Sequence, residues 1–265
     1  MQVVMGSNSR RAAFRAIIVI GLLGFIAQAQ DPFVVAPQAY KLGFENDWIR
    51  VVRVRYAPHE KLPAHDHPKR QSIFVYLNDG GPVRFKHVAG DSGSFPATRP
   101  ATKAGAFRLA SGLSENHVVE NLSELPSEFL QVELKTEKAE AGKFRGRFIP
   151  EPQREAGNYR KVEFDNAQLR ITRFVSVAGG KNEALEPSTY PGVLIALSPL
   201  QMKVTAKGGS KSNLKLKIGE TRWFEPNKLT GWQNLGKASA ETLLIELKTR
   251  PAPGVEAKPH SHNDK

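Results

Sequence analysis

The chain has no cysteine in its 265 residues. This absence excludes disulfide bonds, thiolate metal ligands and a lipid-modified cysteine anchor. The sequence also lacks a phosphate-binding loop, a dinucleotide-binding fingerprint and a Gly-x-Ser-x-Gly elbow, and no set of residues indicates a nucleophilic triad. Helical periodicity is scarce as well, which leaves strands as the main predicted elements.

Basic residues outnumber acidic residues in this chain. Lysine and arginine number 38 against 26 aspartate and glutamate, which gives a formal net charge of +12 at pH 7. The basic residues are scattered rather than clustered, so they indicate a solvated basic surface and not a nucleic-acid interface. We expect a small-molecule ligand or substrate, which could be anionic, and no nucleic-acid partner. Assembly into a homo-oligomer stays open.

The N-terminal segment has the features of an export signal. Three arginines among the first fifteen residues form a basic region, residues 16–27 are uncharged and apolar, and Ala27-Gln28-Ala29 is a small-residue cleavage signature. The apolar stretch is shorter than the roughly 20 residues that cross a bilayer. We predict that residues 1–29 are a cleaved signal peptide and that the mature protein is periplasmic or extracellular, without a stable membrane anchor. An uncleaved N-terminal anchor is the alternative.

The two halves of the chain resemble each other. Residues 41–53 and 161–173 share a lysine, a phenylalanine, an asparagine and two arginines at the same relative positions, 120 residues apart. Further matches follow in the same order, pairing residues 73–77 with 193–197, 105–108 with 219–222, and 129–135 with 243–248. Self-similarity over most of both halves predicts a duplicated domain.

Each half has short runs of Val, Ile, Leu and Phe separated by Gly, Pro, Asn or Asp turns. This pattern predicts an all-β chain of two tandem jelly-roll β-barrels. We place the N-terminal domain at 38–141, a linker rich in charge, Gly and Pro at 142–157, and the C-terminal domain at 158–248. Residues 249–265 are expected to form a disordered tail.

A cluster of potential metal ligands lies in the N-terminal half. In a strand, His65 and His67 project to the same face, and Gln71 joins them if the strand continues without a bulge. His117, from another strand, could complete a site for one divalent transition metal. Imidazole suits Fe, Mn, Ni, Cu or Zn, and a Gln amide oxygen is a weak neutral fourth ligand.

The histidine pair has a plainer explanation, because an HxH pair arises readily by chance in a chain with 7 histidines. A second pair, His260 and His262, lies in the polar tail, where no fold supports it. The first pair is favoured by its context, since an apolar run at 73–77 and an Asn-Asp-Gly-Gly turn at 78–81 follow it.

These motifs resemble those of the cupin superfamily in its two-domain, bicupin form. The first cupin motif is HxH, then three or four residues and a Glu, then a Gly; here it is His65-Asp66-His67, Gln71 in place of Glu, and Gly80. The second motif ends in His, three residues and Asn, here 117–121. The resemblance covers roughly residues 38–248.

The resemblance implies that His65, His67 and His117 bind a metal ion inside a small β-barrel. Because Gln71 stands where the motif has a glutamate, this set of ligands contains no carboxylate. The missing negative charge weakens binding of a divalent ion and leaves no proton acceptor among the ligands. Asn121 is expected to brace its strand rather than to touch metal.

The C-terminal half is expected to be metal-free. Matching the strands places Leu185 and Pro187 at the HxH positions and residues 230–232 near the third histidine, and no histidine occurs between His117 and His260.

Three functions follow as alternatives. In the first, the protein is an exported metal-dependent cupin, and the enzyme hypothesis is an oxygenase that acts on a small molecule. In the second, it is a non-catalytic periplasmic module that binds a small ligand. In the third, it is a structural module whose histidines are vestigial. The sequence does not identify a substrate, because one fold hosts many chemistries.

Overall fold

The computed structural model confirms the all-β class: 55% of the described residues lie in strands and 2% in a helix. The predicted signal peptide lies outside the described residues. No described helix is long and apolar enough to cross a membrane. The described residues are 31–90, 96–138, 144–151, 157–183 and 189–253.

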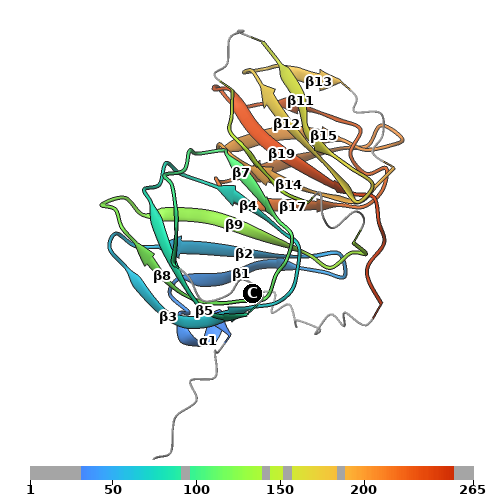
Figure 1. The fold of residues 1–265 in the computed structure, drawn as a ribbon. Coiled ribbons are helices and arrows are strands. Elements are labelled where there is room, and N and C mark those ends of the chain that lie inside the picture. Colours follow the sequence, from blue (N-terminus) through green and yellow to red (C-terminus); the bar gives the residue numbers. More distant parts are fainter. Residues whose placement is uncertain (1–30, 91–95, 139–143, 152–156, 184–188, 254–265) are drawn as a thin grey trace, which may run out of the picture.

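The N-terminal half, coloured blue to green in Figure 1, consists of a short helix, α1 (Pro32–Val35), and two antiparallel sheets. The larger sheet has the spatial order β1 (Tyr40–Glu45), β2 (Ile49–Tyr56), β9 (Ser127–Leu134), β4 (Ser72–Tyr76), β7 (Phe107–Ala110) and β10 (Gly146–Phe148). The smaller sheet has the order β3 (Lys61–His67), β8 (Glu115–Asn121), β5 (Val83–Gly90) and β6 (Pro96–Arg99). This order is that of a two-sheet jelly roll.

The C-terminal half repeats the arrangement. Its larger sheet has the order β11 (Tyr159–Asp165), β12 (Leu169–Ser176), β19 (Ala240–Leu247), β14 (Gly192–Ala196) and β17 (Thr221–Phe224). Its smaller sheet has the order β13 (Lys181–Glu183), β18 (Gly231–Asn234), β15 (Leu200–Thr205) and β16 (Lys211–Leu216). Within the described residues, the strands of each half form two separate sheets, and no closed barrel is found.

Local irregularities recur at matching positions in the two halves. The β1–β2 ladder shifts register between Leu42 and Phe44, and the β11–β12 ladder shifts between Val162 and Phe164. Asn46 and Asn166 each follow the bulged strand, and the side-chain oxygen of each accepts hydrogen bonds from two backbone amides of the next turn. A β-bulge is a specific feature of a fold, so its repetition agrees with the sequence repeat.

The two larger sheets pack against each other at the centre of the molecule (Figure 1). One cluster of buried residues draws side chains from both sheets, while separate clusters fill the space within each half. Along β4, for example, Ile73 and Val75 face the shared cluster and Phe74 and Tyr76 face the interior of the N-terminal half. Burial on both faces explains why these strands have continuous apolar runs rather than strict alternation.

Polar contacts reinforce this junction. Arg173 of the C-terminal half donates a hydrogen bond of 2.7 Å to the carbonyl of Gly105 in the N-terminal half and pairs with Glu241. Arg53, at the matching position of the N-terminal half, donates to the carbonyl of Ile218 at 3.3 Å. The two halves therefore contact each other in an approximately reciprocal way.

The predicted linker and tail contain ordered backbone. β10 lies within the segment 142–157 and pairs with β7, so part of the expected linker belongs to the N-terminal sheet. In the expected tail, Pro251 bridges to Thr136, and the amide of Ala252 donates to the carbonyl of Lys135. The rest of that tail, from residue 254, lies outside the described residues.

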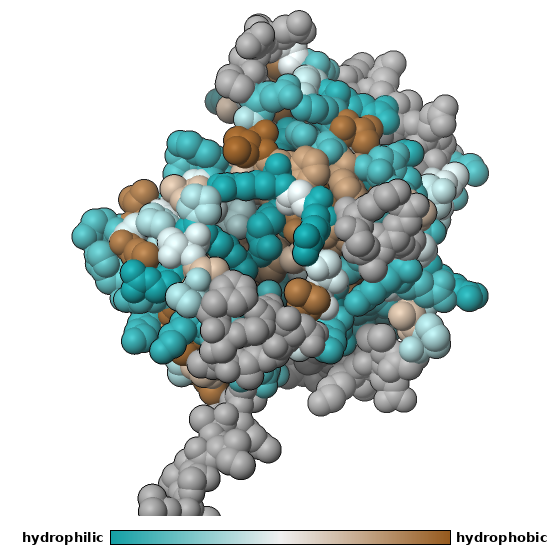
Figure 2. Space-filling view, in the orientation of Figure 1, coloured by the Kyte–Doolittle hydropathy of each residue, from teal (hydrophilic) through white to brown (hydrophobic). Residues whose placement is uncertain are grey.

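The surface in view is mostly hydrophilic, with hydrophobic side chains in small scattered groups (Figure 2). Single exposed apolar residues are normal on a folded protein. The described residues on this face therefore present no extended apolar patch.

Candidate metal centre

The β3–β8 ladder brings the predicted histidines together. β3 shifts register between Leu62 and His65, at Pro63, a residue that cannot donate to a ladder and suits a bulge. After this bulge His65 lies directly opposite His117, and His67 lies opposite Glu115. Directly opposed residues of an antiparallel pair share a face of the sheet, so the three imidazoles project into the interior of the N-terminal half.

The three imidazoles are in contact. Each contributes one nitrogen atom to a set whose members all lie within 4.8 Å of one another. The ring centroids of His65 and His117 are 4.9 Å apart, as are those of His67 and His117. His65 and His117 are buried and His67 is half-buried. The structure thus assembles the cluster that the sequence predicted.

Burial keeps these imidazoles neutral. It lowers the pKa of His65 to about 4, although the hydrogen bond to the Pro63 carbonyl acts in the opposite direction. Burial, and then the neighbouring His117 and His65, lower the pKa of His67 well below its usual value. The pKa of His117 is also lowered by burial, against the opposing effect of Glu115. Neutral imidazole is the form that binds metal.

Hydrogen bonds fix the tautomer of His65. Its Nδ1 lies 2.8 Å from the carbonyl oxygen of Pro63, which can only accept, so Nδ1 carries the proton. Its Nε2 lies 2.9 Å from the hydroxyl of Tyr40 and accepts from it. A backbone carbonyl that orients a histidine in this way is typical of metal ligands.

Glu115 is a carboxylate of the site that the HxH motif does not contain. Its Oε2 lies 3.4 Å from Nδ1 of His117, which is a contact longer than a well-formed hydrogen bond. Burial alone would raise the pKa of Glu115, but the contact with His117 and the charge of Arg99 lower it to about 2. Glu115 is therefore ionised at neutral pH.

A second, overlapping group of potential ligands shares His117. It consists of His87 on β5 with Glu115 and His117 on β8, whose ligand atoms again lie within 4.8 Å of one another. His87 lies opposite His117 in the β5–β8 ladder. Neither His87 nor Glu115 was predicted as a ligand from the sequence, although Glu115 lies two residues before His117 and alternation alone places it on the same face.

Gln71 does not continue the strand of the histidines. β3 ends at His67, and β4 begins at Ser72 in the other sheet, so the condition on which parity placed Gln71 beside them is not met. Gln71 is fully buried, and neither of its amide side-chain atoms has a hydrogen-bond partner among the described residues. Ligation by Gln71 stays a prediction.

The donor set fits a divalent transition metal. Both ring nitrogens of His117 are buried without a hydrogen-bond partner among the described residues, and buried polar atoms normally have one. Three neutral imidazoles with a carboxylate nearby suit the late first-row ions and do not select one of them.

The expected role of Asn121 is confirmed. Its side-chain amide donates to the carbonyls of Ala57 and Leu125, both at 2.9 Å, and so ties the end of β8 to two loops. Asn234 makes the matching contacts in the C-terminal half, with the carbonyls of Ser176 and Ala238.

The position of His117 is not kept in the C-terminal half. Asn121 and Asn234 occupy matching positions. His117 lies four residues before Asn121, whereas Thr230 lies four residues before Asn234. Leu185 and Pro187, the predicted counterparts of the HxH pair, lie outside the described residues.

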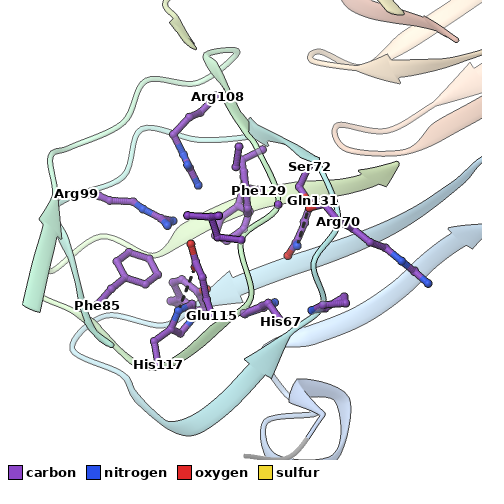
Figure 3. Close-up of a pocket in the computed structure, with 16 residues that line it drawn as sticks. His67, Arg70, Ser72, Phe85, Arg99, Arg108, Glu115, His117, Phe129 and Gln131 are labelled. Atoms are coloured by element: carbon purple, nitrogen blue, oxygen red, sulfur yellow. Dashed lines mark hydrogen bonds and ion pairs between the residues drawn. The ribbon is translucent and has the colours of Figure 1, made fainter. Parts of the chain in front are cut away.

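A pocket opens beside the cluster and contains about 510 Å³ of space free of protein atoms, its open mouth included. His67, Glu115 and His117 line one side, and Arg99 and Arg108 line the other (Figure 3). Burial and the charge of Arg108 lower the pKa of Arg99 to about 10, so the Arg99 guanidinium is charged at neutral pH. Neither arginine was predicted from the sequence as part of the site.

No family model and no curated protein sequence matches the chain. Among solved structures, a mutant of Bacillus subtilis oxalate decarboxylase OxdC has a TM-score of 0.53 and 16% identity, covering 77% of this chain and 70% of that chain. AerE from Microcystis aeruginosa has a TM-score of 0.53 and 11% identity, covering 79% of this chain and 97% of that chain.

A Cupin 2 conserved barrel domain protein from Leptotrichia buccalis has a TM-score of 0.48 and 12% identity, covering 79% of this chain and 88% of that one. Oxalate decarboxylase has a cupin fold, and its similarity to this chain confirms the predicted cupin-type fold. At these identities the similarity concerns the fold alone.

Proposed function

We propose that this protein is an exported bicupin that binds one divalent transition metal through His65, His67 and His117 and acts on a small molecule beside it. Gln71 is the proposed fourth ligand. One observation carries the proposal: three imidazoles, each kept neutral by burial, have nitrogen atoms within 4.8 Å of one another on one face of the β3–β8 ladder.

The metal is one of Fe, Mn, Ni, Cu and Zn. One structure of B. subtilis oxalate decarboxylase was determined to study its Mn(II) centres, which makes manganese a reasonable first ion for reconstitution. A bound ion of this kind polarises and orients a substrate or O₂. Around it, the Tyr56, Phe85 and Phe129 rings line the pocket and limit the access of water. Oxygenation is the reaction that we test first, because three imidazoles leave coordination positions open.

Elemental analysis tests the metal site directly. The mature protein, purified without a histidine tag, is compared with a His65→Ala/His67→Ala variant and with His59→Ala. His59 is the control, since its side chain is 57% exposed and pairs with Glu124 on the surface. We expect about one equivalent of metal in the parent and in His59→Ala, and a loss of metal in the double variant.

Absence of metal in all three proteins, even after reconstitution with each of the five ions, would disprove the metal site. If the metal is present, oxygen consumption with candidate phenolics, keto acids and sugars tests the enzyme hypothesis. A metal-loaded protein that turns over none of them would favour the second function.

That second function is capture of a small ligand without chemistry. It is favoured by the hydrogen bond between Tyr40 and Nε2 of His65, because this bond satisfies the ligand nitrogen without any metal. Ligand binding with equal affinity in the parent and in His65→Ala/His67→Ala would support it.

A further inference from the structure

Arg99 and Arg108 reach the same pocket from opposite sheets. Arg99 is the last residue of β6 in the smaller sheet, and Arg108 lies in β7 of the larger one. Figure 3 shows both guanidinium groups pointing toward the middle of the pocket, toward Glu115. The single negative charge of Glu115 balances only one of these two cations, so the second positive charge in the pocket requires an explanation.

Neither arginine has a salt-bridge partner among the described carboxylates. Nε and Nη2 of Arg108 are buried and lack a hydrogen-bond acceptor within the described part of the chain. Aromatic rings support both groups instead, with Arg108 4.3 Å from the centroid of Phe74 and Arg99 3.8 Å from that of Phe85. Stacking holds a guanidinium in place, but an aromatic ring does not supply acceptors for the N–H groups at its edge.

A third arginine of the pocket provides a contrast. Arg70 pairs with Glu133 at 3.3 Å, and in Figure 3 it points away from Arg99 and Arg108. Glu115 is the one carboxylate among the described pocket residues, and it contacts His117. The pocket therefore holds more positive than negative charge before any metal binds.

We propose that Arg99 and Arg108 bind one carboxylate group of a small dicarboxylate whose other end lies toward His67 and His117. This inference builds on the proposed function, since it names the substrate class of the same pocket. A carboxylate is favoured over a tetrahedral oxyanion because it is planar, as the guanidinium fork is, and because the Phe74, Phe85 and Phe129 rings line the space around it.

Calorimetric titration tests the site with malonate and succinate, each compared with its neutral diamide of nearly the same shape. The proteins are the parent, Arg99→Gln, Arg108→Gln, Arg108→Lys and the control Arg84→Gln. Arg84 lies on β5 but is half exposed and pairs with Glu120 outside the pocket. Inorganic phosphate is the further probe, and elemental analysis of the same samples gives their metal content.

We expect at least one dicarboxylate to bind the parent and Arg84→Gln more tightly than its diamide does. Arg99→Gln and Arg108→Gln should each weaken that binding about 10- to 100-fold, and Arg108→Lys should weaken it by less. Arg108→Gln removes the stacking on Phe74 but no hydrogen bond or ion pair with a described residue, so the melting temperature should change little. A purely structural arginine would lower it.

Equal binding of dicarboxylates and diamides, or unchanged dicarboxylate binding in both glutamine variants, would overturn the inference. Tighter binding of phosphate than of either dicarboxylate would overturn it too. The metal content of the same samples distinguishes failure of this inference from failure of the proposed function. If a protein that takes up no metal binds a dicarboxylate through the arginines, this inference is sustained and the metal role is disproved. If the protein takes up metal but shows no arginine-dependent binding, the metal role is sustained and this inference is disproved.

Discussion

The hydroxyl of Tyr40 lies 2.9 Å from Nε2 of His65 and 3.0 Å from the hydroxyl of Tyr56. Because Nδ1 of His65 donates to the Pro63 carbonyl, Nε2 holds the free electron pair and accepts from Tyr40. The nitrogen that would bind metal thus has a hydrogen-bond donor in front of it. Metal binding has to break this bond.

Replacement of Tyr40 by phenylalanine should therefore have opposite effects on stability and on metal binding. We expect the metal-free protein to lose about 1 kcal/mol of unfolding free energy and the metal affinity to rise roughly 2- to 10-fold. Urea unfolding and competition with a metal chelator measure the two quantities. Tyr56→Phe is the control, because it keeps the contact between Tyr40 and His65. Weaker metal binding by Tyr40→Phe would mean that the phenol supports the bound ion.

Glu115→Gln should weaken metal binding by roughly 10- to 100-fold, because the negative charge 3.4 Å from Nδ1 of His117 increases the basicity of the ring. Glu120→Gln is the matched control on the same strand, since Glu120 pairs with the exposed Arg84. Chelator competition at pH 7 gives both affinities. Equal losses in the two variants would show a general charge effect rather than an effect on His117.

The metal-free protein should lose stability as the pH falls from about 6.5 to about 4. The unfolded chain takes up a proton on His65 near pH 6.5, whereas the folded protein, with a pKa of about 4, excludes it. Stability therefore increases with pH through this window, and His65 alone accounts for roughly 3 kcal/mol. Urea unfolding at several pH values should show a smaller change for His65→Gln than for the parent. Parallel curves would exclude this origin.

Arg173 and Arg53 occupy matching positions and should differ in their effect on stability. The side chain of Arg173 is 3% exposed, whereas that of Arg53 is 40% exposed. Arg173→Met leaves Glu163 and Glu241 without their buried partner and should cost about 3–5 kcal/mol of unfolding free energy. Arg53→Met should cost less than about 1 kcal/mol. Denaturant unfolding of both variants checks the difference, and equal costs would contradict it.

The sequence predicted those features that depend on local pattern. The matching segments 41–53 and 161–173 became matching strand pairs with a bulge at the same place. His65 and His67 share a face because side chains alternate along a strand, and His117 joined them as expected. Asn121 braces β8, as proposed for it.

Features that depend on where strands end, and on which strands they pair with, could not be predicted from local sequence pattern. Parity placed Gln71 with the histidines, but the strand stops at His67 and the chain crosses to the other sheet. Arg99 and Arg108 are nine residues apart in the sequence and face one pocket only because β6 and β7 belong to opposite sheets. Contacts between residues on different sheets follow from the long-range topology of the chain, which no local sequence pattern encodes.

The core shared by the two larger sheets has a consequence for the C-terminal half, although that half does not keep His117. Ile171, Val193 and Ile245 belong to the same apolar cluster as Ile73 and Val132 of the N-terminal half. Either half expressed alone would expose one whole face of a β-sheet, a surface prone to aggregation. The chain should therefore melt in one cooperative transition, and an ion bound in the N-terminal half would also protect strands far from it against hydrogen exchange.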